Sequence, residues 1–417
     1  MLPKTGTGGV SSANDILQIL SSRRFVLVSG KAGSGKSYVL RKLFDVLTDC
    51  NISVSVVAPT GVAAINANGT TIHRWLGVSC DLRANTYKRD HKTINTQVLL
   101  IDEVSMVSCD VFEYIDLFMR SRKRSTIPFG GLKIVMFGDF LQLPPITSQK
   151  QKFIFQSKLW SDINVYRYTL TSSHRHGDLQ YLKILNEVRI GKMSPSSKKI
   201  LSERVLLPPE GTLFTRLCVY RKKAAQFNQS ELDNIQKPST TFSCKISLRS
   251  NTNGNVTQND WKSYKKTMWF IEKFVPVPKE LILKVGATVM MRCNTLLGSG
   301  ICNGSTGKVL SCGLNCVRVS FEGGVVVDIE PYKFIVKNND SSHVIFEQIP
   351  LSLAWAITIH KAQGLTIDCA LVDTDCFECG QLYTALSRVR NLNSLFIDTL
   401  YDDGLIINED AITFESP

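Results

Sequence analysis

The hydrophobic pattern of the first 140 residues predicts strands and helices that alternate around a parallel sheet. An apolar run at 25–29 is followed by a glycine-rich loop, a helical stretch at 38–48 and a second apolar run at 52–58. This order is typical of a β-α-β unit in an α/β fold. Two further apolar runs, at 98–101 and 133–137, each lead into an acidic residue. Because active groups of such sheets lie at the carboxyl ends of the strands, we expect the functional site there.

The pattern changes in the middle of the chain. Residues 193–202 are polar and serine-rich, and we interpret them as a connector. The polar stretch 237–260 is interpreted as an exposed loop or insertion. Between Gly286 and Ile349, short β-rich runs alternate with Gly and Asn turns, which is the pattern of a small β-barrel. Because α/β character returns at Leu351, the barrel is expected to interrupt a larger α/β domain.

Charge narrows the class of partner. Lys and Arg exceed Asp and Glu by 13 over 417 residues, so a polyanion is favoured, with nucleic acid ahead of an anionic membrane surface. The longest stretch without charge, 51–72, contains Pro59 and two glycines and cannot form an apolar helix that spans a bilayer.

Cysteine usage and the first residues indicate an intracellular protein. The 12 cysteines are scattered, which argues against a disulfide framework, and the one pair with metal-ligand spacing, Cys376 and Cys379, has no second pair to complete a site. Residues 1–12 lack the apolar core of a secretory signal. Nucleus, mitochondrion and cytoplasm stay open as compartments, and both a cellular form and one encoded by a large DNA virus fit.

The glycine-rich loop carries the clearest chemistry. Residues 30–37 read GKAGSGKS, which matches G-x-x-x-x-G-K-[ST] between a predicted strand and helix. Backbone N–H groups at such a helix start cradle phosphate, Lys36 would reach the β- and γ-phosphates of a nucleotide, and Ser37 would hold Mg²⁺. The cofactor-binding residues predicted in this loop are Gly30, Gly33, Ser34, Gly35, Lys36 and Ser37.

The two acidic strand ends fit the same reaction. After the run at 98–101, Asp102 would bind the Mg²⁺ shell and Glu103 would orient the attacking water. After the run at 133–137 comes GDFLQLPP, in which Gln142 would sense a γ-phosphate through hydrogen bonds. Together these residues predict an NTPase that uses ATP and Mg²⁺.

Further motifs accompany this loop in a characteristic order. They are APTGVAA at 58–64, TIH at 71–73, DEVSM at 102–106, PFGG at 128–131, His174 with Arg175, VGA at 285–287, NG at 303–304 with Gly307, HKAQG at 360–364, and YTALSR at 383–388. In this combination the chain resembles the petite-integration-frequency (PIF) helicases of the RecD-like, 5′-to-3′ branch of superfamily one. The resemblance covers nearly the whole chain.

The resemblance implies an α/β fold with two RecA-like P-loop domains and a small SH3-like β-barrel inserted in the second. Nucleotide would lie between the two domains, and single-stranded DNA would run across them. The expected boundaries are residues 1–170 for the first domain, with a short wedge at about 76–97, residues 171–284 and 351–417 for the second, and residues 285–350 for the barrel.

The later motifs would complete the site. Because charge on the transferred phosphoryl group needs cations that arrive on closure, Arg175 and Arg388 would act as arginine fingers. Gln363 and Gly364 would complete the γ-phosphate contacts. The resemblance places DNA contacts at six residues, which carry short polar groups or cations suited to phosphate and sugar: Pro59, Thr60, Thr71, His73, His360 and Lys361.

Three features depart from the family pattern. The upstream Gln used for adenine recognition is absent, with Asn14 or Asp15 nearest to its place, so the base preference is open. Ala362 stands where the family more often has Ser. The segment between Trp75 and Thr96, where the family carries its strand-separating wedge, is short, so modest unwinding is expected.

The sequence thus predicts an ATP-dependent 5′-to-3′ DNA helicase that works as a monomeric motor on single-stranded, forked or structured DNA. Three alternatives remain: a helicase for RNA or RNA–DNA hybrids, a P-loop NTPase switch without unwinding, and a nucleic-acid-binding protein that has lost catalysis. RNA differs by a 2′-OH that no motif visibly reads. A switch would not need Gln363, Arg388 and His360, and a catalytically dead binder would not need the intact loop and acids.

Overall fold

The structure, a computed structural model, covers most of the chain. It describes residues 4–6, 10–78, 95–145, 153–171, 178–250, 255–275, 277–293, 296, 301, 303–321, 324–338, 341–401 and 405–416. These residues form two compact units. The first contains the described residues up to Val219 and from Ile359 onward, and the second contains those from Tyr220 to Thr358.

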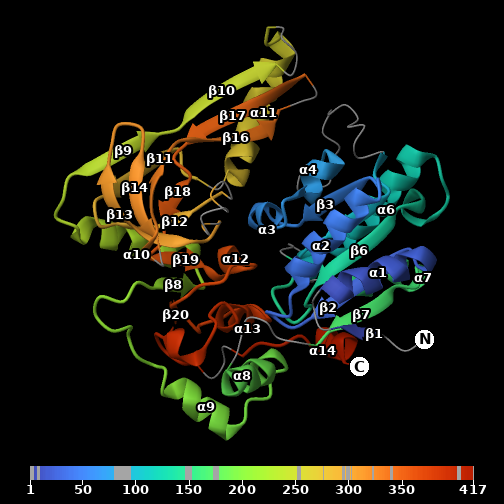
Figure 1. Ribbon diagram of the computed structural model, residues 1–417, viewed down its shortest axis with the longest axis horizontal. Coiled ribbons are helices and arrows are strands. Elements are labelled where there is room, and N and C mark those ends of the chain that lie inside the picture. Colours follow the sequence, from blue (N-terminus) through green and yellow to red (C-terminus); the bar gives the residue numbers. More distant parts are fainter. Residues whose placement is uncertain are drawn as a thin grey trace. The chain divides into compact units, whose positions relative to one another are not determined.

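The first unit begins with alternating strands and helices (Figure 1). Its elements up to Leu170 are β1 (Lys4–Gly6), α1 (Val10–Ser22), β2 (Phe25–Gly30), α2 (Lys36–Asp49), β3 (Val54–Ala58), α3 (Gly61–Asn66), β4 (Thr70–Thr71), α4 (Ile72–Leu76), β5 (Val98–Ile101), α6 (Cys109–Lys123), β6 (Lys133–Gly138), α7 (Lys158–Asp162) and β7 (Tyr166–Leu170). The strands expected at 25–29, 52–58, 98–101 and 133–137 and the helix at 38–48 are thereby confirmed.

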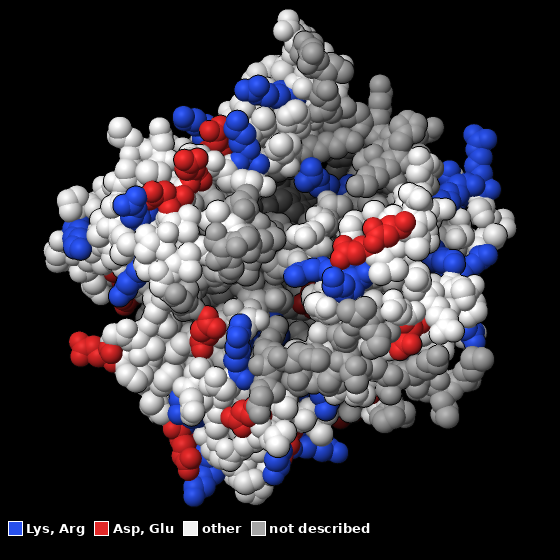
Figure 2. Space-filling model, in the orientation of Figure 1, with Lys and Arg blue, Asp and Glu red and all other residues white. Residues whose placement is uncertain are grey.

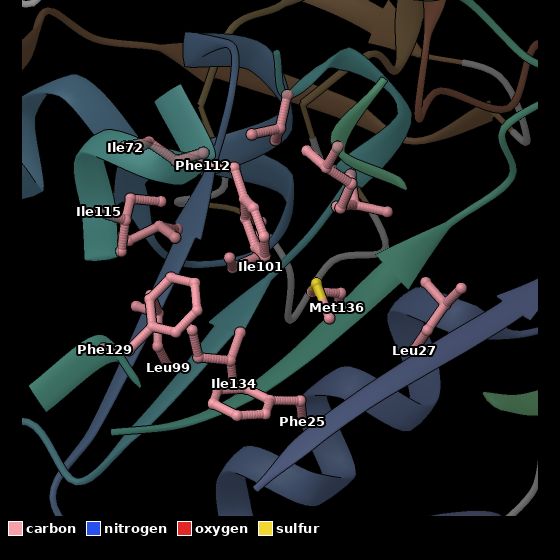
Figure 3. Packing of buried hydrophobic residues seen from close by; sticks show 14 of the residues in the cluster. Phe25, Leu27, Ile72, Leu99, Ile101, Phe112, Ile115, Phe129, Ile134 and Met136 are labelled. Atoms are coloured by element: carbon pink, nitrogen blue, oxygen red, sulfur yellow. The ribbon is translucent and has the colours of Figure 1, made fainter. Parts of the chain in front are cut away.

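The first parallel sheet has helices on both faces because its strands are apolar on both sides. Among the described residues its order is β1-β7-β2-β6-β5-β3-β4, with every neighbouring pair parallel. Successive side chains of a strand point to opposite faces. Accordingly, Val26 and Val28 belong to the cluster that includes α1 and α2, whereas Phe25 and Leu27 belong to the cluster on the other face, which includes Phe112 of α6 (Figure 3).

A second, shorter parallel sheet completes the first unit. Its elements are α8 (Leu179–Arg189), α9 (Pro195–Ser202), β8 (Thr215–Cys218), α12 (Ile359–Ala362), β20 (Ala370–Val372), α13 (Gln381–Leu386), β21 (Leu395–Ile397) and α14 (Glu409–Glu415). Within this unit β20 pairs in parallel with both β8 and β21. The predicted α/β class with parallel sheets is confirmed.

Helix α14 packs with the first sheet's core although it follows the second sheet in sequence. Phe414 stacks on Phe155 with ring centroids 4.2 Å apart and contacts Phe140 edge to face. The Arg167 guanidinium lies 4.5 Å from the centre of the Phe414 ring. Ala411 is fully buried in the same cluster. The end of the described chain is therefore part of the first core.

The second unit is mainly antiparallel. Its elements are α10 (Arg221–Asn234), β9 (Ser239–Ser243), β10 (Lys245–Ser250), α11 (Gln258–Phe274), β11 (Glu280–Lys284), β12 (Thr288–Met291), β13 (Thr306–Cys312), β14 (Val317–Phe321), β15 (Val326–Ile329), β16 (Tyr332–Lys337), β17 (Ser342–Gln348), β18 (Leu351–Leu353) and β19 (Ala356–Thr358). The described strands include an antiparallel sheet of order β15-β14-β13-β12-β18. This sheet occupies most of the stretch expected to form a barrel, whose SH3-like closure stays a prediction. The unit's core also takes Leu232, Phe242 and Leu281 from before residue 285.

Two interpretations of the middle of the chain were wrong. The serine-rich segment 193–202 contains helix α9, because Ser194 caps the helix by accepting a hydrogen bond from the Ser197 N–H and Pro195 occupies its first turn. The polar stretch 237–260 contains strands β9 and β10 and the start of α11. Strand β10 pairs with β17, so backbone hydrogen bonds rather than apolar side chains define it. Of the wedge expected at 76–97, residues 79–94 lie outside the described residues.

Candidate nucleotide site

The phosphate-binding loop joins β2 to α2 at the carboxyl edge of the first sheet. Gly35 precedes the helix with φ of 88°, a left-handed conformation that a side chain disfavours. A Cβ on Gly30 would lie 2.5 Å from the Ser34 Oγ and 3.0 Å from the Leu170 carbonyl oxygen. Glycine at these positions therefore lets the loop fold tightly and leaves the amides at the start of the 14-residue helix α2 available to an anion.

The polar side chains of the loop fit a phosphate chain. Lys36 Nζ donates to the carbonyl oxygens of Gly30 (2.6 Å) and Lys31 (2.9 Å), so its ammonium is held across the loop. The Ser34 hydroxyl is only 2% exposed and has no hydrogen-bond partner among the described residues, so it is free to bind a ligand oxygen. Ser37 lies exposed at the start of α2, where its hydroxyl is a hard oxygen ligand suited to Mg²⁺.

Asp102 and Glu103 follow β5 and are both buried. Asp102 Oδ1 accepts a hydrogen bond from the Glu103 N–H at 2.9 Å. Burial and the neighbouring Glu103 raise the pKa of Asp102 to about 7, against the opposing influence of Lys36 and Arg41. A buried carboxyl with so raised a pKa gains from a cation beside it. The pair therefore fits the magnesium ligand and the base that were predicted from the sequence.

Gln363 reaches Glu103 from the segment after α12. Its Nε2 donates to Glu103 Oε2 at 3.0 Å, while its Oε1 is buried and has no partner among the described residues. A Cβ on the adjacent Gly364 would lie 3.5 Å from Glu103 Oε1. Both residues predicted for γ-phosphate contacts thus lie against the predicted base.

Gln142 follows β6 and is oriented by Asp139, a residue of the quoted motif to which the sequence assigned no role. Gln142 Nε2 donates to Asp139 Oδ2 at 3.4 Å. Asp139 is fully buried and forms an ion pair with Arg189 at 2.9 Å. Burial by itself would raise the pKa of Asp139, but Arg189 and Lys36 override it and hold the pKa below its usual value. Asp139 is therefore an ionised anchor for Gln142.

Sequence reasoning missed the partners of this anchor. The Tyr383 hydroxyl donates to Asp139 Oδ2 at 3.1 Å, and Arg189 also lies 3.6 Å from the Glu415 carboxylate of α14. Tyr383 lies in a quoted motif, which was the one available signal. Arg189 and Glu415 lie 50 and 275 residues from the β6 turn that they contact, so no local spacing indicates them.

Arg388 is buried just after α13. Its Nε donates to the Thr384 carbonyl at 2.8 Å, and its Nη2 to the Ser387 hydroxyl at 2.7 Å. Burial lowers the pKa of Arg388, while the nearby Glu103 carboxylate opposes that shift. The structure thus brings Arg388 within electrostatic reach of Glu103. Arg175, the other predicted arginine finger, lies outside the described residues.

The predicted DNA contacts lie after β3, on β4 with α4, and on α12. Pro59 and Thr60 follow β3, and Thr71 ends the adjacent strand β4. Thr71 caps α4 by accepting from the Arg74 N–H, and Thr60 accepts from the Ala63 N–H, so both hydroxyls also have structural roles. Burial lowers the pKa of His73, which keeps its ring neutral at pH 7.

The remaining predicted DNA contacts, His360 and Lys361, lie on α12, with Lys361 exposed. In the face shown in Figure 2, the described Lys and Arg residues are interspersed with Asp and Glu rather than gathered in a single patch. The surface charge of that face therefore does not by itself mark a DNA path.

The cysteine pair and the helices bear on two further possibilities, a metal site and a membrane span. Burial raises the pKa of the Cys376 and Cys379 thiols to about 12, so both are protonated, and no metal-binding cluster of His, Cys, Asp or Glu occurs among the described residues. Within the same residues, no helix is both long and apolar enough to cross a membrane.

Comparisons with known proteins show which proteins the chain resembles. A family model described as PIF1-like helicase matches residues 13–198, a range that includes the phosphate loop, both acids and Gln142. The chain is related to the PIF1-like helicases. The resemblance predicted from the motifs is confirmed by this match and by the relatives below.

Two solved structures and one sequence relative illustrate the kinship. The chain is 33% identical over 397 residues to the ATP-dependent DNA helicase PIF1 of Xenopus laevis. This match covers 91% of this chain and 60% of that protein. It is 28% identical to the Pif1 helicase from Candida albicans, with a TM-score of 0.80 and coverage of 96% and 97% of the two chains. It is 29% identical to a Bacteroides Pif1 helicase in complex with ADP-AlF3 and ssDNA, with a TM-score of 0.70 and coverage of 97% and 96%. The chain thus spans about 60% of the length of the vertebrate relatives that it matches.

Proposed function

We propose that this chain is an ATP-dependent DNA helicase that translocates 5′ to 3′ on single-stranded DNA. The observation that carries the proposal is the hydrogen bond from Gln363 to Glu103, which joins the predicted base after β5 to a residue that follows α12. A nucleotide bound at the phosphate loop would contact residues from both parallel sheets of the first unit. Its presence could therefore be transmitted between them, as a motor requires.

Each group of the site has a distinct role in hydrolysis. Lys36 and the amides at the start of α2 bind the phosphates, and Ser37 and Asp102 hold Mg²⁺, which supplies charge neutralisation for phosphoryl transfer. Glu103 accepts the proton of the attacking water, and Gln363 holds its carboxylate in place. Arg388 and Arg175 stabilise the charge that develops on the transferred group.

Movement on DNA would follow from the nucleotide cycle. The two RecA-like domains proposed at 1–170 and at 171–284 with 351–417 alternate between closed and open arrangements, and the strand advances because their grips differ. Pro59, Thr60, Thr71, His73, His360 and Lys361 are the proposed contacts to its sugar-phosphate backbone. Single-stranded and forked DNA are the proposed partners, the motor is proposed to be monomeric, and the compartment in which it acts stays a prediction.

The test is the steady-state ATPase rate in Mg²⁺ with and without single-stranded DNA, for the wild type and for Lys36→Ala. We expect strong stimulation by DNA that the substitution abolishes. Unwinding of a duplex with a 5′ overhang, but not of one with a 3′ overhang, would then establish polarity. Stimulation by RNA in preference to DNA would point to the RNA helicase instead.

Two other results would overturn the proposal. Hydrolysis that is indifferent to nucleic acid would indicate a P-loop switch. DNA binding without hydrolysis would indicate a binding protein that has lost catalysis.

A further inference from the structure

Tyr383 lies at the meeting point of two segments of the nucleotide site. It belongs to α13 and is 3% exposed. Its hydroxyl accepts a hydrogen bond from the Ala32 N–H of the phosphate loop at 2.9 Å and donates one to Asp139 Oδ2 at 3.1 Å. A hydroxyl is the smallest side-chain group that accepts from one neighbour while it donates to another. Tyr383 therefore joins the phosphate loop to the turn after β6 through a single oxygen.

Asp139 extends this connection to Gln142. Besides Tyr383, the Asp139 carboxylate accepts hydrogen bonds from the Leu141 N–H (3.2 Å) and from Gln142 Nε2 (3.4 Å). Arg189 Nη2 donates to the carboxylate oxygen Asp139 Oδ1 at 2.9 Å. Three hydrogen bonds, Ala32 to Tyr383, Tyr383 to Asp139 and Gln142 to Asp139, thus connect the phosphate loop to the amide proposed to sense the γ-phosphate.

The same helix also positions Arg388. The Arg388 Nε donates to the carbonyl of Thr384, the residue next to Tyr383. At the start of α13, a Cβ on Gly380 would lie 2.4 Å from the Gln142 carbonyl oxygen, so the helix packs directly on the sensor turn. The phosphate loop, the sensor turn and the predicted arginine finger therefore all contact residues 380–384.

We propose that Tyr383 is a positioning residue for ATP hydrolysis, which couples the phosphate loop to Gln142 through Asp139. The inference rests on the proposed function. Loss of the hydroxyl leaves the Ala32 N–H and one Asp139 oxygen without this partner, and the loop and the sensor then move independently. The phosphates keep their contacts with Lys36 and the helix amides, so catalysis suffers more than ATP binding.

The experiment compares Tyr383→Phe with Tyr181→Phe in the DNA-stimulated ATPase assay. Tyr181 is a matched control because it is also fully buried and its hydroxyl donates to the Leu386 carbonyl, at the end of the same helix. For Tyr383→Phe we expect kcat to fall about tenfold, as for the loss of one buried hydrogen bond, with KM for ATP changed less than threefold. Tyr181→Phe should lower the unfolding midpoint about as much as Tyr383→Phe does, because each loses one buried hydrogen bond. It should leave kcat within twofold of the wild type.

A double-mutant cycle with Gln142→Ala tests the route of the coupling. If Tyr383 acts through Gln142, the phenylalanine substitution costs clearly less in the Gln142→Ala background than in the wild type. If the fold losses in kcat of the two single substitutions simply multiply in the double variant, the inference is overturned. Equal kcat values for the two tyrosine variants would also overturn it. If the wild type shows no DNA-stimulated hydrolysis that Lys36→Ala abolishes, the proposed function itself fails, and the inference fails with it.

Discussion

The amide of Gln363 donates to the carboxylate of Glu103 across 260 residues of sequence, at 3.0 Å. Glu103 itself has a left-handed backbone with φ of 50°, a conformation that is strained for a residue with a side chain. The hydrogen bond from Gln363 holds the carboxylate in one orientation. A base with a fixed orientation needs no reorganisation when the reaction begins.

Glu103→Gln should separate binding from chemistry. The amide still offers an oxygen to Gln363 but cannot accept a proton, so we expect kcat to fall by about 10²–10⁴ while ATP still binds. Steady-state kinetics and equilibrium nucleotide binding measure the two quantities. Asp110→Asn, an acid-to-amide change at an exposed position of α6, is the control and should keep the wild-type rate. Equal kcat values for the two variants would show that Glu103 is not the base.

Gly380→Ala should damage the site through packing. Its φ is +69°, and the added methyl group would lie 2.4 Å from the Gln142 carbonyl oxygen and 2.6 Å from that of Leu141. Gly211→Ala is the matched control, since Gly211 also has a positive φ (+81°) but open space around it. Both changes should cost about 1 kcal/mol in unfolding free energy for backbone strain. Only Gly380→Ala should also lower the DNA-stimulated ATPase rate, by at least tenfold, and similar rates for the two would contradict this packing role.

Arg189→Met should destabilise the fold in a pH-dependent way. The substitution leaves Asp139 buried without its cation, which costs about 3–5 kcal/mol of unfolding free energy at neutral pH. Without Arg189, burial raises the folded-state pKa of Asp139 above its unfolded value near 4, so the penalty appears above that pH and grows as pH rises. Urea titrations at pH 5 and pH 8 should therefore show a larger deficit at pH 8.

The control for this prediction is Arg318→Met. Arg318 forms a bidentate pair with Asp328 on an exposed surface, where solvent screens the interaction. Its loss should change stability far less than the loss of Arg189. A deficit for Arg189→Met that is small or independent of pH would show that Asp139 is not held ionised by this pair.

Lys361→Ala should weaken binding to single-stranded DNA. The exposed ammonium on α12 is proposed to contact a phosphate, so its removal should reduce the slope of log K against log[salt] by about 0.7. Fluorescence anisotropy at several salt concentrations measures the slope. Lys199→Ala, at an exposed position of α9, should leave it unchanged. An unaltered slope for Lys361→Ala would exclude this contact.

The sequence predicted best where local chemistry decides the structure. The run 98–101 is strand β5 over the same residues, because a continuous apolar stretch in a doubly covered sheet has no other favourable place. The phosphate loop was equally clear, since glycine, lysine and serine at fixed spacing determine both the turn and the helix start. Helix α9 was missed because the polar Ser194 is its cap, and among its residues only Ser197 and Leu201 are buried.

The rest of the site depends on contacts that no local pattern encodes. Tyr383 and Asp139 are 244 residues apart, and Tyr383 and Ala32 are 351 apart. Nothing in the spacing of either motif indicates that a tyrosine hydroxyl will lie between them. Arg189 ends an amphipathic helix, where a basic residue is ordinary and its ion pair with Asp139 is not foreseeable.

The packing of α14 on the first core has a consequence for folding. Phe140 donates its backbone N–H to Glu415, a residue 275 positions later, and the ring of Phe414 is part of the aromatic cluster around Phe140. A chain that emerges in order from the ribosome cannot complete this core until the second unit and the second parallel sheet have been made. Closure of this long loop slows folding, and until it occurs the Phe155 ring lacks Phe414, one of the two rings on which it stacks. The aromatic cluster around Phe140 is therefore completed only at the end of synthesis, although most of the surrounding core comes from residues made much earlier.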